Sequence, residues 1–325
     1  MTVSQDKKEK IVFMIRDAIY AAVILNYNSG DLTCKCIDSL LKQKVDIEIV
    51  VVDNSSTDDS LKKISERFDN NSYVHTIKST ANEGYARGNN KGIDYIRHNL
   101  KKVKYISIIN PDITFEDQDI FYKLGCKLMS DDQLSIIGCL NIFNGYLNSL
   151  DNSCWQFPSK INLFFSGTLL GRLFCKKGNY TYNSVPVKSG IAYVDVVPGC
   201  FFLAKAEDLY KIQGFDPNTF LYFEENIIAK KISNINKKLA VCVNCLCYHN
   251  HLIRDKQLTN RSSNLFSCKC FYTSKEYYLK KYSKQNVLFI LFSVMYNKFD
   301  FTVRKCIYYV LKNLKKKHTL TDTKL

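Results

Sequence analysis

The feature that most constrains the fold is a regular alternation of short apolar runs and amphipathic segments. Ile19 to Leu25 is an apolar run of strand length, Asp31 to Lys42 repeats apolar residues at helical spacing, and Ile47 to Val52 is a second apolar run. A further helix is predicted to end near Phe68. Strands and helices that alternate in this way predict a parallel sheet with right-handed crossovers, so we expect an α/β protein.

The same alternation continues to about residue 248, with one interruption. Between Asn141 and Ser189 the sequence is rich in Asn, Ser, Gly and aromatic residues and shows no regular period. Long irregular segments inside regular domains are usually functional, so we expect a functional loop or lid here. The other predicted strands are Tyr73–Ile77, Lys104–Ile109, Leu134–Leu140 and Leu239–Tyr248, and the other predicted helices are Asn89–Asn99, Phe115–Met129, Ala204–Ile212 and Asn226–Ile235.

Polar side chains directly follow several predicted strands, and Asp112 is the clearest case. Pro111 has no N–H for a sheet hydrogen bond and ends the preceding strand, which places Asp112 just beyond a carboxyl end. Ligands bind at that edge of open α/β sheets, so a carboxylate fixed there is a candidate for a metal or phosphate site. The alternative is that Asn110, Pro111 and Asp112 form only a turn.

Asp53 follows the second predicted strand in the same way. A buried carboxylate at this position can accept a hydrogen bond from a pyrimidine N–H or a ribose hydroxyl. The alternative is that the run from Asp53 to Ser56 caps the next helix. Both interpretations remain open from these residues alone.

Glu224 and Glu225 are adjacent carboxylates that follow an aromatic run at a predicted helix start. The helix dipole favours acids at this position, but aromatic surroundings can also raise the pKa of a carboxyl group and make it a general base. His249 and His251 end the last predicted strand, where an imidazole either binds a metal or faces solvent.

The 13 cysteines are an odd number scattered along the chain. This usage fits a reducing compartment better than a disulfide framework, so we expect a cytoplasmic protein. Strand alternation places Cys245 and Cys247 on one face and Cys242 on the other, which argues against a zinc site.

The net charge of +15 is concentrated near the C-terminus, since sixteen Lys and Arg stand against four acids from Arg254 onward. No apolar run reaches the roughly 18 residues that span a bilayer. Residues 1–18 lack a secretory pattern and are expected to be flexible. Residues 255–325 interleave aromatics and lysines at helical spacing. Such a tail can lie on an anionic membrane surface, or pack as a subdomain or homodimer interface.

Eight short motifs occur in order between Ala21 and Arg254. They are Val-Ile-Leu-Asn-Tyr-Asn (23–28), Val-Val-Val-Asp-Asn-Ser-Ser-Thr-Asp (50–58), Asn-Glu-Gly-Tyr-Ala-Arg-Gly-Asn-Asn-Lys-Gly (82–92), Ile-Asn-Pro-Asp (109–112), Pro-Gly-Cys-Phe-Phe-Leu (198–203), Gly-Phe-Asp (214–216), Tyr-Phe-Glu-Glu (222–225) and Tyr-His-Asn-His (248–251). Together they resemble the family 2 glycosyltransferases, inverting nucleotide-sugar enzymes with the GT-A fold, and most closely their bacterial rhamnosyltransferase- and galactofuranosyltransferase-like branch.

The resemblance implies a Rossmann-like, mostly parallel GT-A sheet over residues 19–254, with residues 141–189 on the acceptor side and residues 255–325 as a basic helical extension. Asp53 would bind the nucleotide base, with Asn26 and Tyr27 lining its pocket. The loop that carries Gly84, Arg87 and Asn89 would contact the nucleotide sugar.

The resemblance also implies a metal and a base. Asp112 matches the last aspartate of an Asp-x-Asp-like motif, and His249 matches a second ligand of Mg²⁺ or Mn²⁺. Asn110, at the nucleotide sugar, stands where many relatives have the first aspartate. Glu225 matches the catalytic base, more often an aspartate, and Glu224 lies beside it.

The function implied is transfer with inversion from a UDP- or dTDP-sugar to a saccharide hydroxyl. The acceptor would be linked to a polyprenyl diphosphate, and the product would be O-antigen or capsule made at the inner face of the cytoplasmic membrane. Because Asn110 and Glu225 depart from the commoner residues, a catalytically impaired sugar-nucleotide binder is the alternative. A nucleic-acid-binding protein is disfavoured, since the near-neutral body offers no basic face with stacking aromatics.

Overall fold

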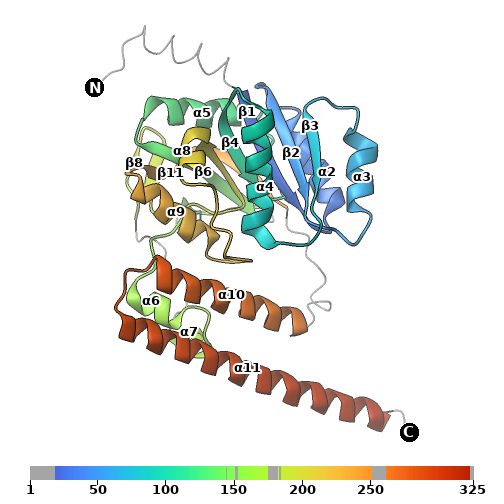
Figure 1. The fold of residues 1–325 in the computed structure, drawn as a ribbon, viewed down its shortest axis with the longest axis vertical. Coiled ribbons are helices and arrows are strands. Elements are labelled where there is room, and N and C mark those ends of the chain that lie inside the picture. Colours follow the sequence, from blue (N-terminus) through green and yellow to red (C-terminus); the bar gives the residue numbers. More distant parts are fainter. Residues whose placement is uncertain are drawn as a thin grey trace. The chain divides into compact units, whose positions relative to one another are not determined.

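The computed structural model describes residues 19–143, 145–150, 153–174, 182, 184–250 and 261–322. The chain divides into two compact units (Figure 1). Unit 1 comprises Met1–Phe157, Thr181–Phe220 and Glu224–His251, and unit 2 comprises Pro158–Tyr180, Leu221–Phe223 and Leu252–Leu325. The predictions for residues 1–18 and for His251 lie outside the described residues.

Unit 1 is built on one mixed sheet. Its strands are β1 (Ile19–Asn26), β2 (Ile47–Asp53), β3 (Val74–Lys78), β4 (Val103–Ile109), β5 (Ile113–Thr114), β6 (Leu134–Phe143), β7 (Tyr146–Leu147), β8 (Val187–Lys188), β9 (Ile191–Val194), β10 (Phe201–Lys205) and β11 (Lys238–His249). The order is β3-β2-β1-β4-β10-β6-β11-β9-β8, with β5 paired to β11 and β7 paired to β6. β1 to β4 pair in parallel, as predicted, whereas β10 runs antiparallel to β4 and β6.

Helices cover both faces of this sheet, because successive side chains of a buried strand point to opposite faces (Figure 1). Ile24 of β1 packs in a core with Ile37 and Leu124, whereas its neighbour Val23 packs in a second core with Ile96 and Ile232. The helices of unit 1 are α2 (Gly30–Leu40), α3 (Ser60–Phe68), α4 (Gly84–Asn99), α5 (Ile120–Ser130), α8 (Ala206–Lys211) and α9 (Glu224–Asn234).

α4 begins at Gly84, five residues earlier than predicted from the sequence. Its glycines allow the helix to lie close to β1, since a Cβ at Gly88 would lie 2.4 Å from Leu25 Cδ1 and one at Gly92 would lie 2.4 Å from Val23 Cγ1. The glycine-rich motif at residues 82–92 is therefore the first half of a helix rather than a free loop.

The prediction that Cys242 faces away from Cys245 and Cys247 was wrong. The register of β11 against β6 shifts between Cys242 and Leu246, and this irregularity brings all three cysteines into one core. Cys242 Sγ lies 3.5 Å from Cys245 Sγ. Within the part of the chain that is described, no cluster of three or more His, Cys, Asp or Glu residues could hold a metal ion.

Unit 2 is helical and consists of α6 (Lys160–Phe165), α7 (Leu169–Phe174), α10 (Arg261–Lys281) and α11 (Val287–Asp322). The sequence predicted helices in the tail but an irregular segment at residues 141–189, where α6 and α7 occur. These two helices group with the tail, so unit 2 is larger than the predicted extension. Of the helices in the described residues, none is both long enough and apolar enough to cross a membrane.

Candidate active site

The ends of β1 and β2 form the first part of the candidate site. Asn26 pairs with Asp53 across the two strands, and its Nδ2 donates to Asp53 Oδ1 at 2.8 Å. Ser56 also donates to Asp53, from its hydroxyl to Oδ1 at 2.5 Å and from its N–H to Oδ2 at 3.1 Å. Asp53 therefore organises the turn after β2, and a carboxylate has lone pairs for a further donor. Tyr27, next along the chain, keeps 43% of its surface exposed.

Asp112 and His249 lie together at the end of β4, as the metal prediction requires. The pairing of β5 with β11 sets His249 opposite Ile113, and the N–H of Asn250 donates to the carbonyl of Asp112 at 2.8 Å. His249 Nε2 is 3.2 Å from Asp112 Oδ2, with 16% and 14% of the side chains exposed. Sheet pairing thus joins two residues from distant parts of the sequence.

The donor set of this pair fits a divalent cation. A carboxylate oxygen and an imidazole nitrogen are both ordinary ligands of Mn²⁺ and related ions. The observed separation of 3.2 Å allows both atoms to bind one ion. Beyond the two ligands found among the described residues, such an ion would take ligands from substrate or water.

Glu225 is in the first turn of α9, and its neighbours come from two other elements. A Cβ at Gly199 would lie 2.9 Å from Glu225 Oε1 and 3.1 Å from Tyr85 Oη, so the three residues are in close proximity. Tyr85 Oη donates to the carbonyl of Gly199 at 2.6 Å. Burial raises the pKa of Glu225, while its own N–H and that of Gly199 act in the opposite direction. Glu224, its neighbour, is buried.

Tyr85 was not predicted as a functional residue, although it lies in the motif at residues 82–92. Burial raises its pKa well above the usual value, and the negative charges of Glu225 and Glu224 add to this effect. Its N–H donates to the carbonyl of Phe220 at 2.8 Å. The one signal in the sequence was an aromatic residue among glycines and amides, which does not reveal its partner.

Cys200 is a buried residue near both Asp112 and Glu225. The N–H of Asn110 donates to the carbonyl of Cys200 at 2.8 Å. Burial is the main cause that raises the pKa of the Cys200 thiol, and the charges of Cys247, Asp112 and Glu225 add to it. Asp112 and Glu225 therefore both lie within electrostatic range of one buried thiol.

Gly84, Arg87 and Asn89, the three residues predicted to contact the nucleotide sugar from residues 82–92, all lie in α4. The amide of Asn54 donates to the carbonyl of Gly84 at 3.2 Å, which ties the start of α4 to the end of β2. Arg87 is exposed and donates its Nε–H to the carbonyl of Pro217 at 2.8 Å. Asn89 is buried and donates to the carbonyl of Tyr85 at 3.0 Å, so its amide serves α4 itself.

The fold defined by this sheet and its helices is the GT-A fold of glycosyltransferases. The mannosyltransferase PcManGT from Pyrobaculum calidifontis superposes with a TM-score of 0.53 at 13% identity, covering 88% of this chain and 73% of that one. GalNAc-T7 superposes with a TM-score of 0.55 at 15% identity, covering 78% of this chain and 54% of that one. At these identities the likeness shows the fold alone.

Residues 21–148 match the model of glycosyl transferase family 2. Rhamnosyltransferase WbbL of Escherichia coli strain K12 is 24% identical over 220 residues, which is 65% of this chain and 75% of that protein. The hexosyltransferase Agl10 of Haloferax volcanii, of low-salt glycan biosynthesis, is 38% identical over 73 residues, or 22% of each chain. Residues 21–148 are therefore a glycosyltransferase family 2 domain, which confirms the predicted resemblance.

Proposed function

We propose that this glycosyltransferase moves a sugar from a UDP- or dTDP-sugar to a hydroxyl group of a saccharide acceptor, with inversion. The observations that support the proposal are the 3.2 Å separation of Asp112 and His249 and the position of Cys200 within electrostatic range of both Asp112 and Glu225, in a chain with a family 2 domain. Two solved structures with this fold contain ligands of this kind. PcManGT is in complex with GDP-Man and Mn²⁺, and GalNAc-T7 with UDP, GalNAc and Mn²⁺.

Glu225 is the general base in this proposal. Its carboxylate takes the proton of the acceptor hydroxyl, and the oxygen attacks the anomeric carbon from the face opposite to the leaving diphosphate. Burial raises the pKa of Glu225, which makes its ionised form a stronger base near neutral pH. The N–H of Gly199 favours that ionised form and holds the carboxylate in place.

Asp112 and His249 would hold Mg²⁺ or Mn²⁺ against the diphosphate of the donor. When bound, the ion supplies positive charge that stabilises the departing nucleoside diphosphate. Asn110 adds no charge here, so we propose that the diphosphate itself supplies most of the negative charge around the ion.

The nucleotide would lie at the ends of β1 and β2. In this proposal Asp53 accepts an N–H of the base, Asn26 fixes that carboxylate, and the exposed ring of Tyr27 lines the pocket. A guanidinium has five N–H donors, so Arg87 can bind a phosphate while it holds the carbonyl of Pro217. Gly84 and Asn89 shape the start of α4 beside it.

For the acceptor, we propose a saccharide linked to a polyprenyl diphosphate, in the synthesis of a bacterial surface polysaccharide such as O-antigen or capsule. The support is the similarity to rhamnosyltransferase WbbL, together with the basic second unit. The enzyme would then work as a peripheral protein at the inner face of the cytoplasmic membrane.

The test is release of nucleoside diphosphate from a panel of UDP-, dTDP- and GDP-sugars, with and without Mn²⁺. We expect Mn²⁺-dependent release that Glu225→Gln abolishes, whereas Glu207→Gln, an exposed glutamate at the start of α8, leaves it unchanged. Asp112→Asn is expected to abolish the stimulation by Mn²⁺, with the exposed Asp69→Asn as control.

NMR of the first product gives the stereochemistry. Inversion at the anomeric carbon is expected, and retention would contradict a single displacement by Glu225. If the donors raise the melting temperature but no sugar is transferred or hydrolysed, the chain is the catalytically impaired binder instead.

A further inference from the structure

The two faces of α11 have the reverse of the usual polarity. Along its outer side, exposed apolar side chains recur every three or four residues, which forms one continuous stripe on a helix. Phe292 and Phe299, for example, expose 64% and 66% of their surfaces. The side chains that we call the outer stripe are Val287, Leu288, Leu291, Phe292, Met295 and Phe299.

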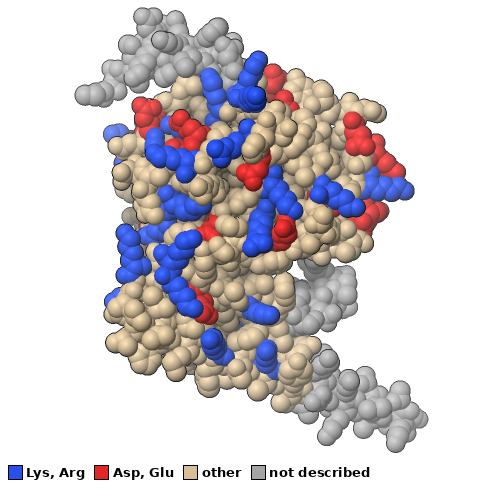
Figure 2. All heavy atoms as spheres, viewed as in Figure 1, with Lys and Arg blue, Asp and Glu red and all other residues tan. Residues whose placement is uncertain are grey.

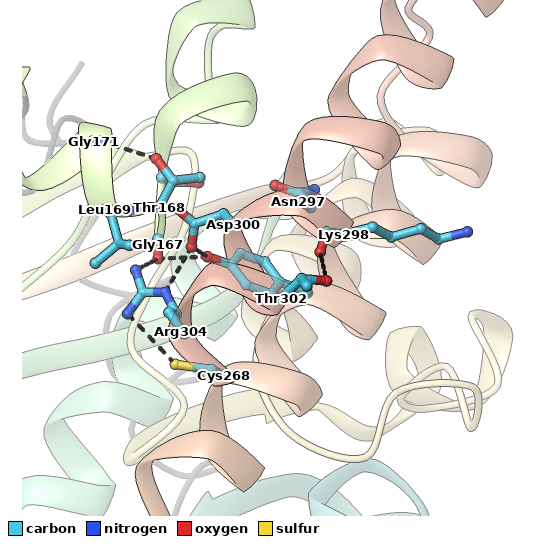
Figure 3. A network of polar contacts seen from close by, with 12 residues as sticks. Gly167, Thr168, Leu169, Gly171, Cys268, Asn297, Lys298, Asp300, Thr302 and Arg304 are labelled. Carbon is cyan, nitrogen blue, oxygen red and sulfur yellow. Dashed lines mark hydrogen bonds and ion pairs between the residues drawn. The ribbon is translucent and has the colours of Figure 1, made fainter. Parts of the chain in front are cut away.

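The inner face of α11 is polar. Ser293, Asn297 and Asp300 are buried, at one-turn intervals, within unit 2. Asp300 accepts hydrogen bonds from Arg304 Nε at 2.6 Å, from Tyr272 Oη at 2.6 Å and from the N–H of Leu169 at 2.7 Å. Figure 3 shows Asp300 and Arg304 directed towards the segment from Gly167 to Leu169.

A buried lysine also bonds to this face. Lys275 of α10 is fully buried, and its Nζ donates to the carbonyls of Phe164 and Ser166 and to Asn297 Oδ1 at 3.0–3.1 Å. These bonds join α10, α11 and the end of α6. Asn297 and Asp300 would lose their partners on α10 and α7 if α11 rotated, so these bonds hold the outer stripe away from the interior of unit 2.

A stripe of this kind is unfavourable in water, where soluble proteins rarely expose a large contiguous apolar surface. Helices that turn polar side chains inward and apolar side chains outward are typical of an apolar environment. Since no helix of the described residues can cross a membrane, the arrangement fits a helix that lies in the plane of the interface.

Either a bilayer or a second copy of the chain could cover the outer stripe, and the charge of unit 2 favours the bilayer. Unit 2 contains 20 of the 46 Lys and Arg residues of the chain but only 4 of its 31 acids. Of these acids, Asp300 is buried and Glu276 bonds to Lys280 at 2.5 Å. On the face drawn in Figure 2, most Asp and Glu side chains belong to unit 1.

Lys298 and Lys305 are exposed beside the outer stripe. A second copy that docked on the stripe would bring like charges together, whereas an anionic surface would neutralise them. We propose that α11 docks on an anionic phospholipid bilayer, with the outer stripe in the boundary between headgroups and acyl chains and with Lys298 and Lys305 at the lipid phosphates. This deepens the peripheral location proposed above, but it requires neither the donor nor the acceptor assigned there.

The test is co-sedimentation of the whole chain with extruded vesicles, either of phosphatidylcholine alone or of phosphatidylcholine with one quarter phosphatidylglycerol. Binding to the anionic vesicles is expected, with much weaker binding to the neutral ones and a decrease at high salt. Equal binding to both vesicles, or binding to neither, would overturn the proposal, whatever the outcome of the transfer assay.

Two double variants locate the surface. Phe292→Gln with Phe299→Gln should weaken binding to anionic vesicles at least about thirtyfold, since it removes two large apolar groups from the bilayer. Lys298→Ala with Lys305→Ala should also weaken that binding about thirtyfold and leave the weak binding to neutral vesicles unchanged.

The control is Tyr146→Gln with Leu147→Gln, two residues of unit 1 that are 79% and 60% exposed, and it should bind as the parent does. Light scattering measures the mass of each variant in solution. A dimer that the phenylalanine variant dissociates, with vesicle binding unchanged, would assign the outer stripe to a second copy and refute the proposal. The lysine variant keeps the test decisive if the phenylalanine variant unfolds.

Discussion

At the scale of single residues, the candidate base depends on a glycine. Because Gly199 has no side chain, the Glu225 carboxylate and the Tyr85 hydroxyl can lie close to its backbone. A Cβ at Gly199 would lie 2.9 Å from Glu225 Oε1 and 3.1 Å from Tyr85 Oη. The sequence showed Glu225 as one of two adjacent acids, and only the family resemblance separated them. The structure separates them physically, because the carboxylate nearest to a Cβ at Gly199 is that of Glu225.

Gly199→Ala should therefore lower kcat about a hundredfold, since the methyl group displaces a reacting carboxylate and small displacements of this kind are costly. Stability should change by no more than about 1–3 kcal/mol, the usual cost of one extra methyl in a packed site. Gly138→Ala is the matched control, because a Cβ there meets no atom closer than 3.6 Å. Equal kcat for the two variants would mean that Gly199 does not position the base.

The pKa of Glu225 gives a prediction about pH. Because burial raises this pKa in the folded state, the base is protonated at pH values where an exposed glutamate is ionised. We expect kcat/KM to fall as the pH decreases through this pKa, which burial raises above the ordinary glutamate value. A pH profile whose acid limb lies at or below that ordinary value would contradict the assignment.

The same shift has a thermodynamic consequence. A folded-state pKa above the unfolded value means that folding favours the protonated form, so this carboxyl group costs stability as the pH rises through the folded pKa. Glu225→Gln removes that cost. The variant should thus melt at a higher temperature than the parent at pH 8, and the difference should shrink towards pH 4.

At the scale of elements, the sequence predicted the central strands well. β1, β2, β4 and β6 begin within a residue of the predicted positions, because each is a buried apolar run that starts after a polar stretch. β5 has only two residues and was missed, although its pairing with β11 is what brings His249 to Asp112. The shift in β11 was also invisible, since strand register depends on the partner and not on local composition.

α4 and β1 provide a prediction at this scale. A Cβ at Gly92 would lie 2.4 Å from Val23 Cγ1, and Val23 is fully buried in β1. Gly92→Ala should destabilise the protein by about 1 kcal/mol or more, because the clash outweighs the better helix propensity of alanine. Urea unfolding measures the change. A stabilised variant would show that α4 can move away from the sheet at no cost.

At the scale of the whole molecule, composition predicted a basic tail but not its extent. The predicted extension began at residue 255, whereas unit 2 also includes Pro158–Tyr180 and Leu221–Phe223. Short helices such as α6 and α7 have too few turns to show a clear hydrophobic period in the sequence. Their polar contacts within unit 2 join residues that are far apart in the sequence, so local patterns do not reveal them. The residues of the candidate site, by contrast, all lie in unit 1.

This division permits the two units to be followed separately. Trp155, the one tryptophan of the sequence, belongs to unit 1, where its Nε1–H donates to Asn226 Oδ1 at 3.1 Å. Lys275, Phe164, Ser166 and Asn297 all belong to unit 2. Tryptophan fluorescence therefore reports on unit 1, while the far-ultraviolet circular dichroism signal also includes the long helices of unit 2.

Lys275→Met should destabilise unit 2 by about 3 kcal/mol or more, because it leaves three buried acceptors without their donor. The dichroism transition should move to lower temperature, whereas the fluorescence transition, and its stabilisation by UDP with Mn²⁺, should persist. Lys269→Met, at an exposed position of the same helix, is the control and should change neither signal. If both transitions moved together in Lys275→Met, the two units would unfold as one cooperative structure, and the buried lysine would support the catalytic domain as well as the helices around it.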